Sequence, residues 1–245
     1  MQALHAGVIA GVREPYDWAR VLEWLGTRAI PGLESVADGV YRRGGIAVRF
    51  AGGALHVEGG EPDPGVVARV FDTGHDTAAL AEAWRDSAEA SALLARAPGI
   101  RVPGAWSGWE LAVRAVLGQQ VSVAGARKTA EKLVALHGGG FPAPEALIDG
   151  PLPGMPASRA RTLRALARAV AGGLRLDPPV DLAATRAELL ELPGIGPWTV
   201  EYVAMRALRD PDAWPATDLW MRRADVDADS FRPWRAYAAM LVWQT

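Results

Sequence analysis

The fold is decided by the stretch Leu189-Leu190-Glu191-Leu192-Pro193-Gly194-Ile195-Gly196-Pro197-Trp198-Thr199-Val200-Glu201-Tyr202. A helix that includes Leu190 is expected to end before Pro193, because proline cannot continue a helix. Gly194 and Gly196 permit a tight turn, and Pro197 suits the first position of a second helix, where its missing N–H has no partner to lose. The stretch therefore predicts two helices joined by a hairpin turn.

The predicted turn has the features of an anion site. It presents exposed backbone N–H groups and the positive end of a helix dipole, which together can hold one phosphate. Such a site binds phosphate without reading base sequence. The alternative interpretation is a plain turn between two helices that binds nothing.

Around the hairpin, from about Pro64 to the end of the chain, the sequence has a helical period and is dominated by Ala, Leu, Arg and Glu. Ser107 followed three residues later by Glu110 is typical of a capping box, and it predicts a helix that stops near Gly118. Further helices are expected over residues 122–137 and 157–171, the second with an apolar face.

The first part of the chain has a different pattern, in which one amphipathic helix over residues 16–28 is accompanied by short strands. The pairs Gly44-Gly45 and Gly52-Gly53 supply the positive φ angles that two-residue hairpin turns demand. The fold class predicted is therefore α+β, mainly α-helical, with a small N-terminal α+β domain. The expected strands cover residues 40–43, 46–51 and 54–58, and residues 3–12 alternate loosely.

The composition excludes several kinds of site. The chain has 245 residues, half of them apolar, and no cysteine, which excludes disulfides, thiolate nucleophiles, iron–sulfur clusters and cysteine-based zinc sites. Its four histidines have no metal-ligand spacing, and no apolar run approaches the roughly 20 residues needed to cross a bilayer. The N-terminus lacks a basic region followed by a long apolar segment, so we expect a cytoplasmic protein with no membrane partner.

The net charge of -2 argues against a nucleic-acid binder, which usually presents a basic face. The charges are unevenly distributed, however, because residues 1–100 hold 9 basic and 13 acidic groups whereas residues 101–245 hold 17 and 15. A phosphate-bearing partner is therefore expected on the side of residues 101–245. A site made of backbone amides also needs few side-chain cations.

A second stretch, Trp214-Pro215-Ala216-Thr217-Asp218-Leu219-Trp220-Met221-Arg222-Arg223, follows the hairpin. Together the two resemble the helix-hairpin-helix DNA glycosylase superfamily, and within it the AlkA-type bacterial 3-methyladenine DNA glycosylase II family, which carries an Asp after the second hairpin helix. The counterpart here is Asp218. Nearly the whole chain takes part in the resemblance, through further segments in family order: Pro15-Tyr16-Asp17-Trp18, Ser35-Val36-Ala37-Asp38, Ala115-Val116-Leu117-Gly118-Gln119-Gln120-Val121-Ser122 and Pro233-Trp234-Arg235-Ala236-Tyr237.

The resemblance implies an N-terminal α+β domain followed by two helical subdomains, with the active-site cleft between the subdomains. The N-terminal domain is expected to cover residues 1–86. One helical subdomain is expected to combine residues 87–107 and 211–245 and to carry the catalytic Asp. The other is expected to cover residues 108–210 and to end in the helix-hairpin-helix.

The resemblance also implies a function: a monofunctional glycosylase of base excision repair, which flips an alkylated base of the 3-methyladenine or 7-methylguanine type out of duplex DNA and hydrolyses its N-glycosidic bond. Asp218 would stabilise the oxocarbenium-like cation of the sugar, or orient or deprotonate the attacking water. The alternative role of Asp218 is that of a helix N-cap. The expected partner is double-stranded DNA with damaged bases, the expected state is a monomer, and no cofactor is required.

Site residues follow from the resemblance position by position. An aromatic pocket would attract a positively charged alkylated base, although any single tryptophan is more often a core residue than a pocket residue. Gln120 would be the wedge that replaces the flipped base, and its alternative is an ordinary polar loop residue. A monovalent cation could be held by the backbone carbonyls of Leu190, Leu192 and Ile195. The expected base-binding residues are Trp24, Trp198, Tyr202, Leu219, Trp220 and Trp243, and the expected DNA-binding residues are Gln119, Gln120, Gly194, Gly196 and Thr199.

Two features bear on the reaction type. Superfamily members that also cut the DNA strand place a lysine two residues after the second hairpin glycine, where this chain has Trp198, so no lyase activity is expected. Residues 224–232 are shorter and more acidic than the family segment, where a helix would be expected. The open alternatives are a catalytically impaired helix-hairpin-helix DNA-binding module, and a glycosylase for another lesion such as hypoxanthine or uracil.

Overall fold

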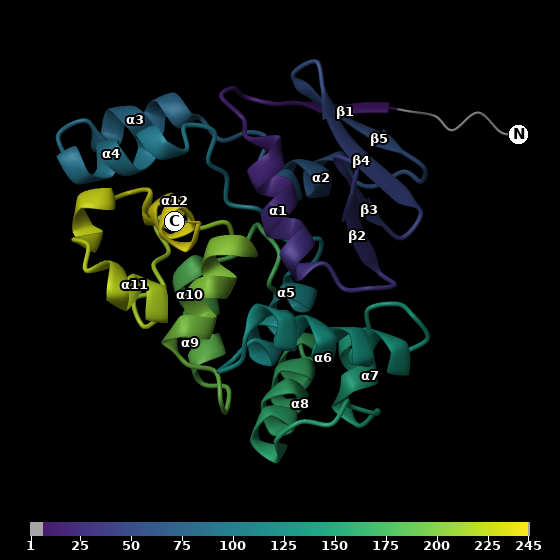
Figure 1. Cartoon of the computed structure of the whole chain (residues 1–245). Coiled ribbons are helices and arrows are strands. Elements are labelled where there is room, and N and C mark those ends of the chain that lie inside the picture. The colour runs from purple at the N-terminus through teal and green to yellow at the C-terminus, as the bar shows by residue number, and fades with distance from the viewer. Residues whose placement is uncertain (1–6, 245) are drawn as a thin grey trace, which may run out of the picture.

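A computed structural model describes residues 7–244, and within them five antiparallel strands form one sheet in the order β1-β5-β4-β3-β2 (Figure 1). The three strands predicted between residues 40 and 58 are confirmed with the same bounds. Of the predicted stretch 3–12, the part 3–6 lies outside the described residues. The strands are β1 (Gly7–Gly11), β2 (Glu34–Ala37), β3 (Val40–Arg43), β4 (Ile46–Ala51) and β5 (Ala54–Glu58).

The glycine pairs connect the strands as expected, with one difference. Gly44, Gly52 and Gly53 have positive φ angles of 55°, 57° and 73°, which L residues with a side chain rarely adopt. Gly45 does not have a positive φ. The β4–β5 turn therefore requires both of its glycines, whereas the β3–β4 turn requires only Gly44.

Helix α1 (Trp18–Arg28) packs against β2 and β3 and also touches the helical part of the protein through α6. Asp17 caps it by accepting a hydrogen bond from the Arg20 amide at 3.0 Å. Its buried face is made of Val21, Leu22, Trp24 and Leu25. Because Trp24 and Arg28 are four residues apart, both lie on the same side of the helix.

The rest of the chain is helical, which confirms the α+β class (Figure 1). Helix α5 lies at the centre, contacts α6, α8 and α10, and has nearly every residue buried. The hairpin joins α9 to α10 as the sequence predicts. The helices are α2 (Pro64–Phe71), α3 (Thr77–Trp84), α4 (Ala88–Arg96), α5 (Gly108–Leu117), α6 (Val123–Leu136), α7 (Pro144–Ile148), α8 (Ala157–Ala171), α9 (Leu182–Leu190), α10 (Pro197–Arg206), α11 (Leu219–Ala224) and α12 (Arg235–Trp243).

The capping box predicted at the start of α5 forms only by half. The Ser107 hydroxyl accepts from the Glu110 amide at 3.5 Å, as expected. The Glu110 carboxylate does not return to the cap but pairs with Arg43 and Arg114. Ion pairs with Arg43 and Arg114 have therefore replaced the hydrogen bond that the Glu110 carboxylate would accept from the Ser107 amide in a complete capping box.

The short acidic segment 224–232 is ordered around a single turn of 3₁₀ helix, Ala228–Phe231. Phe231 is fully buried, and its carbonyl accepts a hydrogen bond from the Trp84 indole at 2.9 Å. The segment is therefore anchored on α3 although it lacks the expected helix. No helix in residues 7–244 is both long and apolar enough to span a bilayer.

Candidate active site

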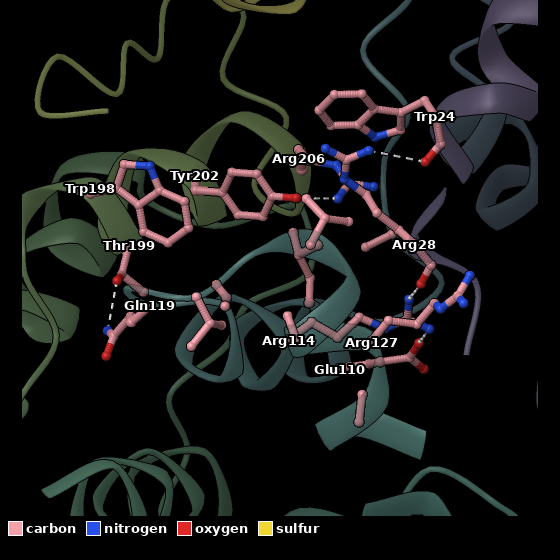
Figure 2. A pocket seen from close by; sticks show the side chains of 18 of the residues that line it. Trp24, Arg28, Glu110, Arg114, Gln119, Arg127, Trp198, Thr199, Tyr202 and Arg206 are labelled. Atoms are coloured by element: carbon pink, nitrogen blue, oxygen red, sulfur yellow. Dashed lines mark hydrogen bonds and ion pairs between the residues drawn. The ribbon is translucent and has the colours of Figure 1, made fainter. Parts of the chain in front are cut away.

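A cavity of about 1110 Å³ opens between α1, α5, the loop that follows α5, the hairpin and helices α10 to α12 (Figure 2). It is lined by Gln119 and Gln120 from the loop, Gly194 and Gly196 from the hairpin, and Asp218 from the segment before α11. All six predicted base-binding residues line it as well. The fold thus brings together residues from both ends of the chain around one space.

Asp218 lies on the cavity wall and its carboxylate is held on three sides. Its Oδ2 accepts a hydrogen bond from the Trp198 indole N–H at 2.8 Å. Its Oδ1 accepts from the Trp243 indole N–H at 3.1 Å and from the Trp220 backbone amide at 2.9 Å. Asp218 is therefore both the N-cap of α11 and a fixed carboxylate inside the cavity.

Four aromatic side chains form a continuous row along the cavity. The rings of Trp198 and Tyr202 stack with centroids 5.2 Å apart, and Tyr202 meets the edge of Trp243 at 6.0 Å. Trp243 in turn stacks on Trp24 at 5.6 Å. Trp198 and Tyr202 share one face of α10, as their spacing predicts.

Leu219 and Trp220 differ from this row because they face solvent at the cavity mouth. Their exposed fractions are 57% and 56%. The guanidinium of Arg223 lies 5.7 Å from the Trp220 ring centroid. These two side chains therefore belong to the exposed rim of the cavity rather than to its buried wall.

Two arginines that the sequence analysis did not single out lie at the inner end of the cavity (Figure 2). Arg28 covers Trp24 with its Cζ 3.3 Å from the ring centroid, and Arg206 donates from Nη1 to the Tyr202 hydroxyl at 2.7 Å. Burial alone raises the pKa of the Tyr202 phenol, but Arg206 and Arg28 lower it below its ordinary value. The i,i+4 spacings of Trp24 to Arg28 and of Tyr202 to Arg206 were the available signal.

Behind this inner end, a buried ion-pair network joins the sheet to α5. Arg43 pairs with Glu34 and Glu110, and Arg114 pairs with the same two carboxylates. Burial raises the pKa of the Glu34 carboxyl, but Arg114 and Arg43 outweigh it and hold that pKa below its usual value. The network balances two negative charges with two positive ones, so it fixes the wall without adding net charge.

The loop after α5 reaches across the cavity mouth to the hairpin. Gln119 donates from Nε2 to the Gly194 carbonyl at 3.0 Å and to the Thr199 hydroxyl at 2.9 Å. Thr199 is only 2% exposed, so its side chain faces Gln119 rather than solvent. Gln120 is exposed, lines the cavity and has a positive φ of 57°.

The hairpin differs from expectation at one of its two glycines. Gly194 has a φ of 81°, and a Cβ there would collide with the Thr162 hydroxyl on α8. Gly196 has a φ of -110° and is the N-cap of α10, so the turn does not need its positive-φ freedom. A Cβ at Gly196 would meet nothing within 4 Å, which leaves the start of α10 open to a ligand.

The predicted cation site would consist of main-chain carbonyls only. The Leu192 carbonyl accepts a hydrogen bond from the Ile195 amide at 3.1 Å within the turn, where a second lone pair is left. The part of the chain that the structure describes has no cluster of three or more His, Cys, Asp or Glu residues suited to a metal ion. The donor set at the hairpin therefore fits a weakly held monovalent cation better than a transition metal.

Comparison with known proteins identifies the family of the chain. A family model described as the AlkA N-terminal domain matches residues 10–64. The chain is 31% identical to DNA-3-methyladenine glycosylase 2 of Escherichia coli, over 94% of each chain. It is 35% identical to a probable bifunctional transcriptional activator/DNA repair enzyme AlkA of Mycobacterium tuberculosis over 96% of its own length, but spans only 56% of the length of that relative.

Solved structures share the fold. A 3-methyladenine DNA-glycosylase from Archaeoglobus fulgidus superposes with a TM-score of 0.80 at 19% identity, covering 96% of both chains. An 8-oxoguanine glycosylase/lyase from Clostridium acetobutylicum superposes with a TM-score of 0.71 at 14% identity, covering 93% of this chain and 92% of the other. At these identities the similarity supports the architecture and not the substrate.

Proposed function

The chain belongs to the AlkA-type family of DNA-3-methyladenine glycosylases, and from this premise we propose that it hydrolyses the N-glycosidic bond of alkylated bases in duplex DNA. The observation that carries the proposal is the position of Asp218, a carboxylate held by two indole N–H groups on the wall of an aromatic cavity. The hairpin and its open Gly196 lie on the same cavity.

The first step is the grip on DNA. The amides at the start of α10 bind one phosphate of the damaged strand, because the helix dipole and the unpaired N–H groups both favour an anion there. A base is then rotated out of the stack into the cavity, at a cost of about a few kcal/mol for unstacking. Gln120, which is exposed beside the cavity, fills the gap and can hydrogen-bond the base left without a partner.

The second step is bond cleavage. As the bond to the base breaks, positive charge develops on the deoxyribose, and the Asp218 carboxylate of the cavity wall stabilises that charge. Water adds at the deoxyribose carbon that carried the base and gives up a proton. The electrons of the broken N-glycosidic bond leave with the base. An alkylated purine already carries a positive charge, so it leaves without prior protonation.

The proposal includes hydrolysis without strand cleavage. A lyase needs an amine that forms a Schiff base with the sugar. The sequence contains only two lysines, Lys128 and Lys132, both on α6, and neither lines the cavity. The corresponding position on α10 is occupied by Trp198, which holds Asp218 instead.

We further propose that the protein acts as a monomer in the cytoplasm, because one wedge and one pocket address one base, and that it requires no cofactor. A monovalent cation at the carbonyls of Leu190, Leu192 and Ile195 would supply a positive charge beside the bound phosphate. Comparing DNA affinity in potassium, sodium and tetramethylammonium salts at equal ionic strength tests the cation.

Base release from duplexes that each carry one lesion, separated by chromatography, tests the enzymatic proposal. The wild-type protein is expected to release 7-methylguanine and 3-methyladenine and to leave the strand intact. Asp218→Asn is expected to lower the single-turnover rate at least about a hundredfold while keeping DNA affinity. Salt-dependent DNA binding with no base release from any lesion would reduce the protein to a binding module.

A further inference from the structure

The inner end of the cavity carries positive charge that no described carboxylate neutralises. Arg206 is only 6% exposed, and its hydrogen bonds go to the carbonyls of Pro103 and Gly104 and to the Tyr202 hydroxyl. Arg28 donates to the Trp24 carbonyl and to the Thr27 hydroxyl. In residues 7–244, neither guanidinium forms a salt bridge, in contrast to Arg43 and Arg114 close by.

The same end of the cavity offers a buried hydrogen-bond donor without an acceptor. The Trp24 indole N–H is buried and has no hydrogen-bond partner among the described residues. Trp24 lines the cavity together with Arg28 and Arg206, and arginine can only donate. Buried donors cost free energy when they are left unpaired, so this end is built to receive an acceptor atom.

A cationic base meets two obstacles here. The Trp24 face is already covered by Arg28, with Cζ 3.3 Å from the ring centroid, and cannot also stack on a second cation. The Arg206 guanidinium lies 5.4 Å from the Tyr202 centroid and 5.7 Å from that of Trp24, so its charge acts on anything between these rings. Like charges at such separations repel strongly when water is excluded.

We propose that Arg28 and Arg206 are specificity-determining residues, which favour a neutral damaged purine whose carbonyl oxygen accepts their hydrogen bonds and disfavour a cationic purine. This inference rests on the proposed glycosylase function and narrows it. A cationic base is still released, because its glycosidic bond is weak. Release of a neutral 6-oxopurine, in contrast, depends on the two arginines for its position in the cavity.

Hypoxanthine and 7-methylguanine make the informative pair of lesions, since both carry a carbonyl at the same ring position and only 7-methylguanine is cationic. Single-turnover rates are measured for each lesion in the same duplex sequence. Arg28→Met, which removes charge and donors, is expected to lower the hypoxanthine rate about tenfold to a hundredfold. The 7-methylguanine rate is expected to stay the same or rise.

Arg28→Gln keeps a donor but removes the charge. Its rate of 7-methylguanine release is expected to change as in Arg28→Met. Its rate of hypoxanthine release is expected to fall less than in Arg28→Met. Because Arg28 ends α1 and is only partly buried, both variants are expected to fold, which circular dichroism checks. Arg127→Met is the matched control, because exposed Arg127 lines the same cavity from α6, and its loss should weaken release of both lesions equally.

The outcomes separate the inference from the function on which it rests. A ratio of the two rates that is unchanged in Arg28→Met, or a wild-type protein that releases 7-methylguanine but no hypoxanthine, overturns the inference and leaves the glycosylase in place. A wild-type protein that releases neither base but does release 3-methyladenine also overturns the inference alone, whereas one that releases no lesion base at all refutes the glycosylase, and the inference with it.

Discussion

At the scale of single residues, the N-cap role of Asp218 is compatible with the catalytic role that we propose for it. A carboxylate has about four acceptor positions, and the cap uses only one of them. The Trp220 amide and the Trp243 indole take Oδ1, and the Trp198 indole takes Oδ2. The cap fixes the backbone of the aspartate and the two indoles fix the direction of its carboxylate, so both roles support one orientation.

The Trp198 indole N–H should therefore matter apart from the ring that carries it. Trp198→Phe keeps an aromatic face beside Tyr202 but removes the donor to Oδ2 at 2.8 Å. A lost hydrogen bond to a charged group predicts a single-turnover rate about tenfold to a hundredfold lower, with DNA affinity retained. Trp214→Phe, which lies outside the cavity against Phe231, is the control and should leave the rate unchanged. Equal rates for the two variants would mean that the indole N–H does not position Asp218.

The sequence predicts the aromatic residues of the site but not its arginines. Trp198 and Tyr202 were expected in the pocket from the family resemblance, and their four-residue spacing predicts that they share one helix face. Arg28 and Arg206 come from helices far apart in sequence and meet only because α1 and α10 line one cavity. The hydrogen bond from Gln119 to Thr199 is likewise a tertiary contact, which no local sequence pattern predicts.

At the scale of elements, the two hairpin glycines should differ in role: Gly194 should matter for the stability of the turn, and Gly196 for its binding of DNA. Gly194→Ala forces a side chain into positive φ and against Thr162, so the free energy of unfolding should fall by about 1–3 kcal/mol. Gly196→Ala meets no atom within 4 Å and should leave that free energy nearly unchanged, but should weaken DNA binding by obstructing phosphate. Urea denaturation and fluorescence anisotropy of labelled duplex measure the two quantities. If Gly196→Ala binds DNA as tightly as the wild type, the phosphate does not bind at the start of α10.

Gln119 links the loop after α5 to the hairpin, so the proposed phosphate site and the proposed wedge, Gln120, should act together. Gln119→Ala removes both hydrogen bonds of Nε2 and leaves the buried Thr199 hydroxyl without this partner. Base flipping, followed by the fluorescence of 2-aminopurine beside the lesion, should become weaker by about threefold to tenfold. Gln120→Ala should also reduce flipping, but without changing the stability of the hairpin. Wild-type flipping in Gln119→Ala would contradict the coupling.

The helices were predictable because their ends are coded locally. Three helix starts are set by local residues, namely the caps Ser107 and Ser122 and Pro197 at a first helical position. The structure reproduces these starts within one residue. Strand β2 was not predicted, because Glu34–Ala37 lacks a sustained apolar alternation. It becomes a strand by pairing with β3, where Val36 lies opposite Tyr41.

At the scale of the whole molecule, a buried cluster around Asp72 ties the first third of the chain to its end. Asp72 ends α2, and its carboxylate accepts from the Val102 amide at 2.9 Å, the Tyr237 hydroxyl at 3.0 Å and Arg209 at 2.5 Å. These partners belong to the α4–α5 connection, to α12 and to the segment after α10. The cluster therefore fixes α12, and with it Trp243, relative to the sheet and α1.

His75 belongs to the same cluster and makes it sensitive to acid. Its ring stacks on Tyr237 with centroids 3.8 Å apart. Burial lowers the pKa of His75 from 6.5 to about 4, with Arg101 and Arg209 adding to the effect and Asp72 and Asp76 opposing it. The unfolded chain therefore binds a proton near pH 6.5 that the folded protein accepts only near pH 4.

Between these two values, falling pH favours the unfolded state, so the folded protein should lose about 3 kcal/mol of stability from His75 alone. His75→Phe keeps a ring against Tyr237 and removes the titration, so its free energy of unfolding should fall less steeply from pH 6.5 to pH 4. Urea denaturation at several pH values measures both slopes, and His56→Gln, on the sheet and bonded to the Ala51 carbonyl, should follow the wild type. Parallel curves for wild type and His75→Phe would show that His75 is protonated in the folded protein as readily as in the unfolded chain.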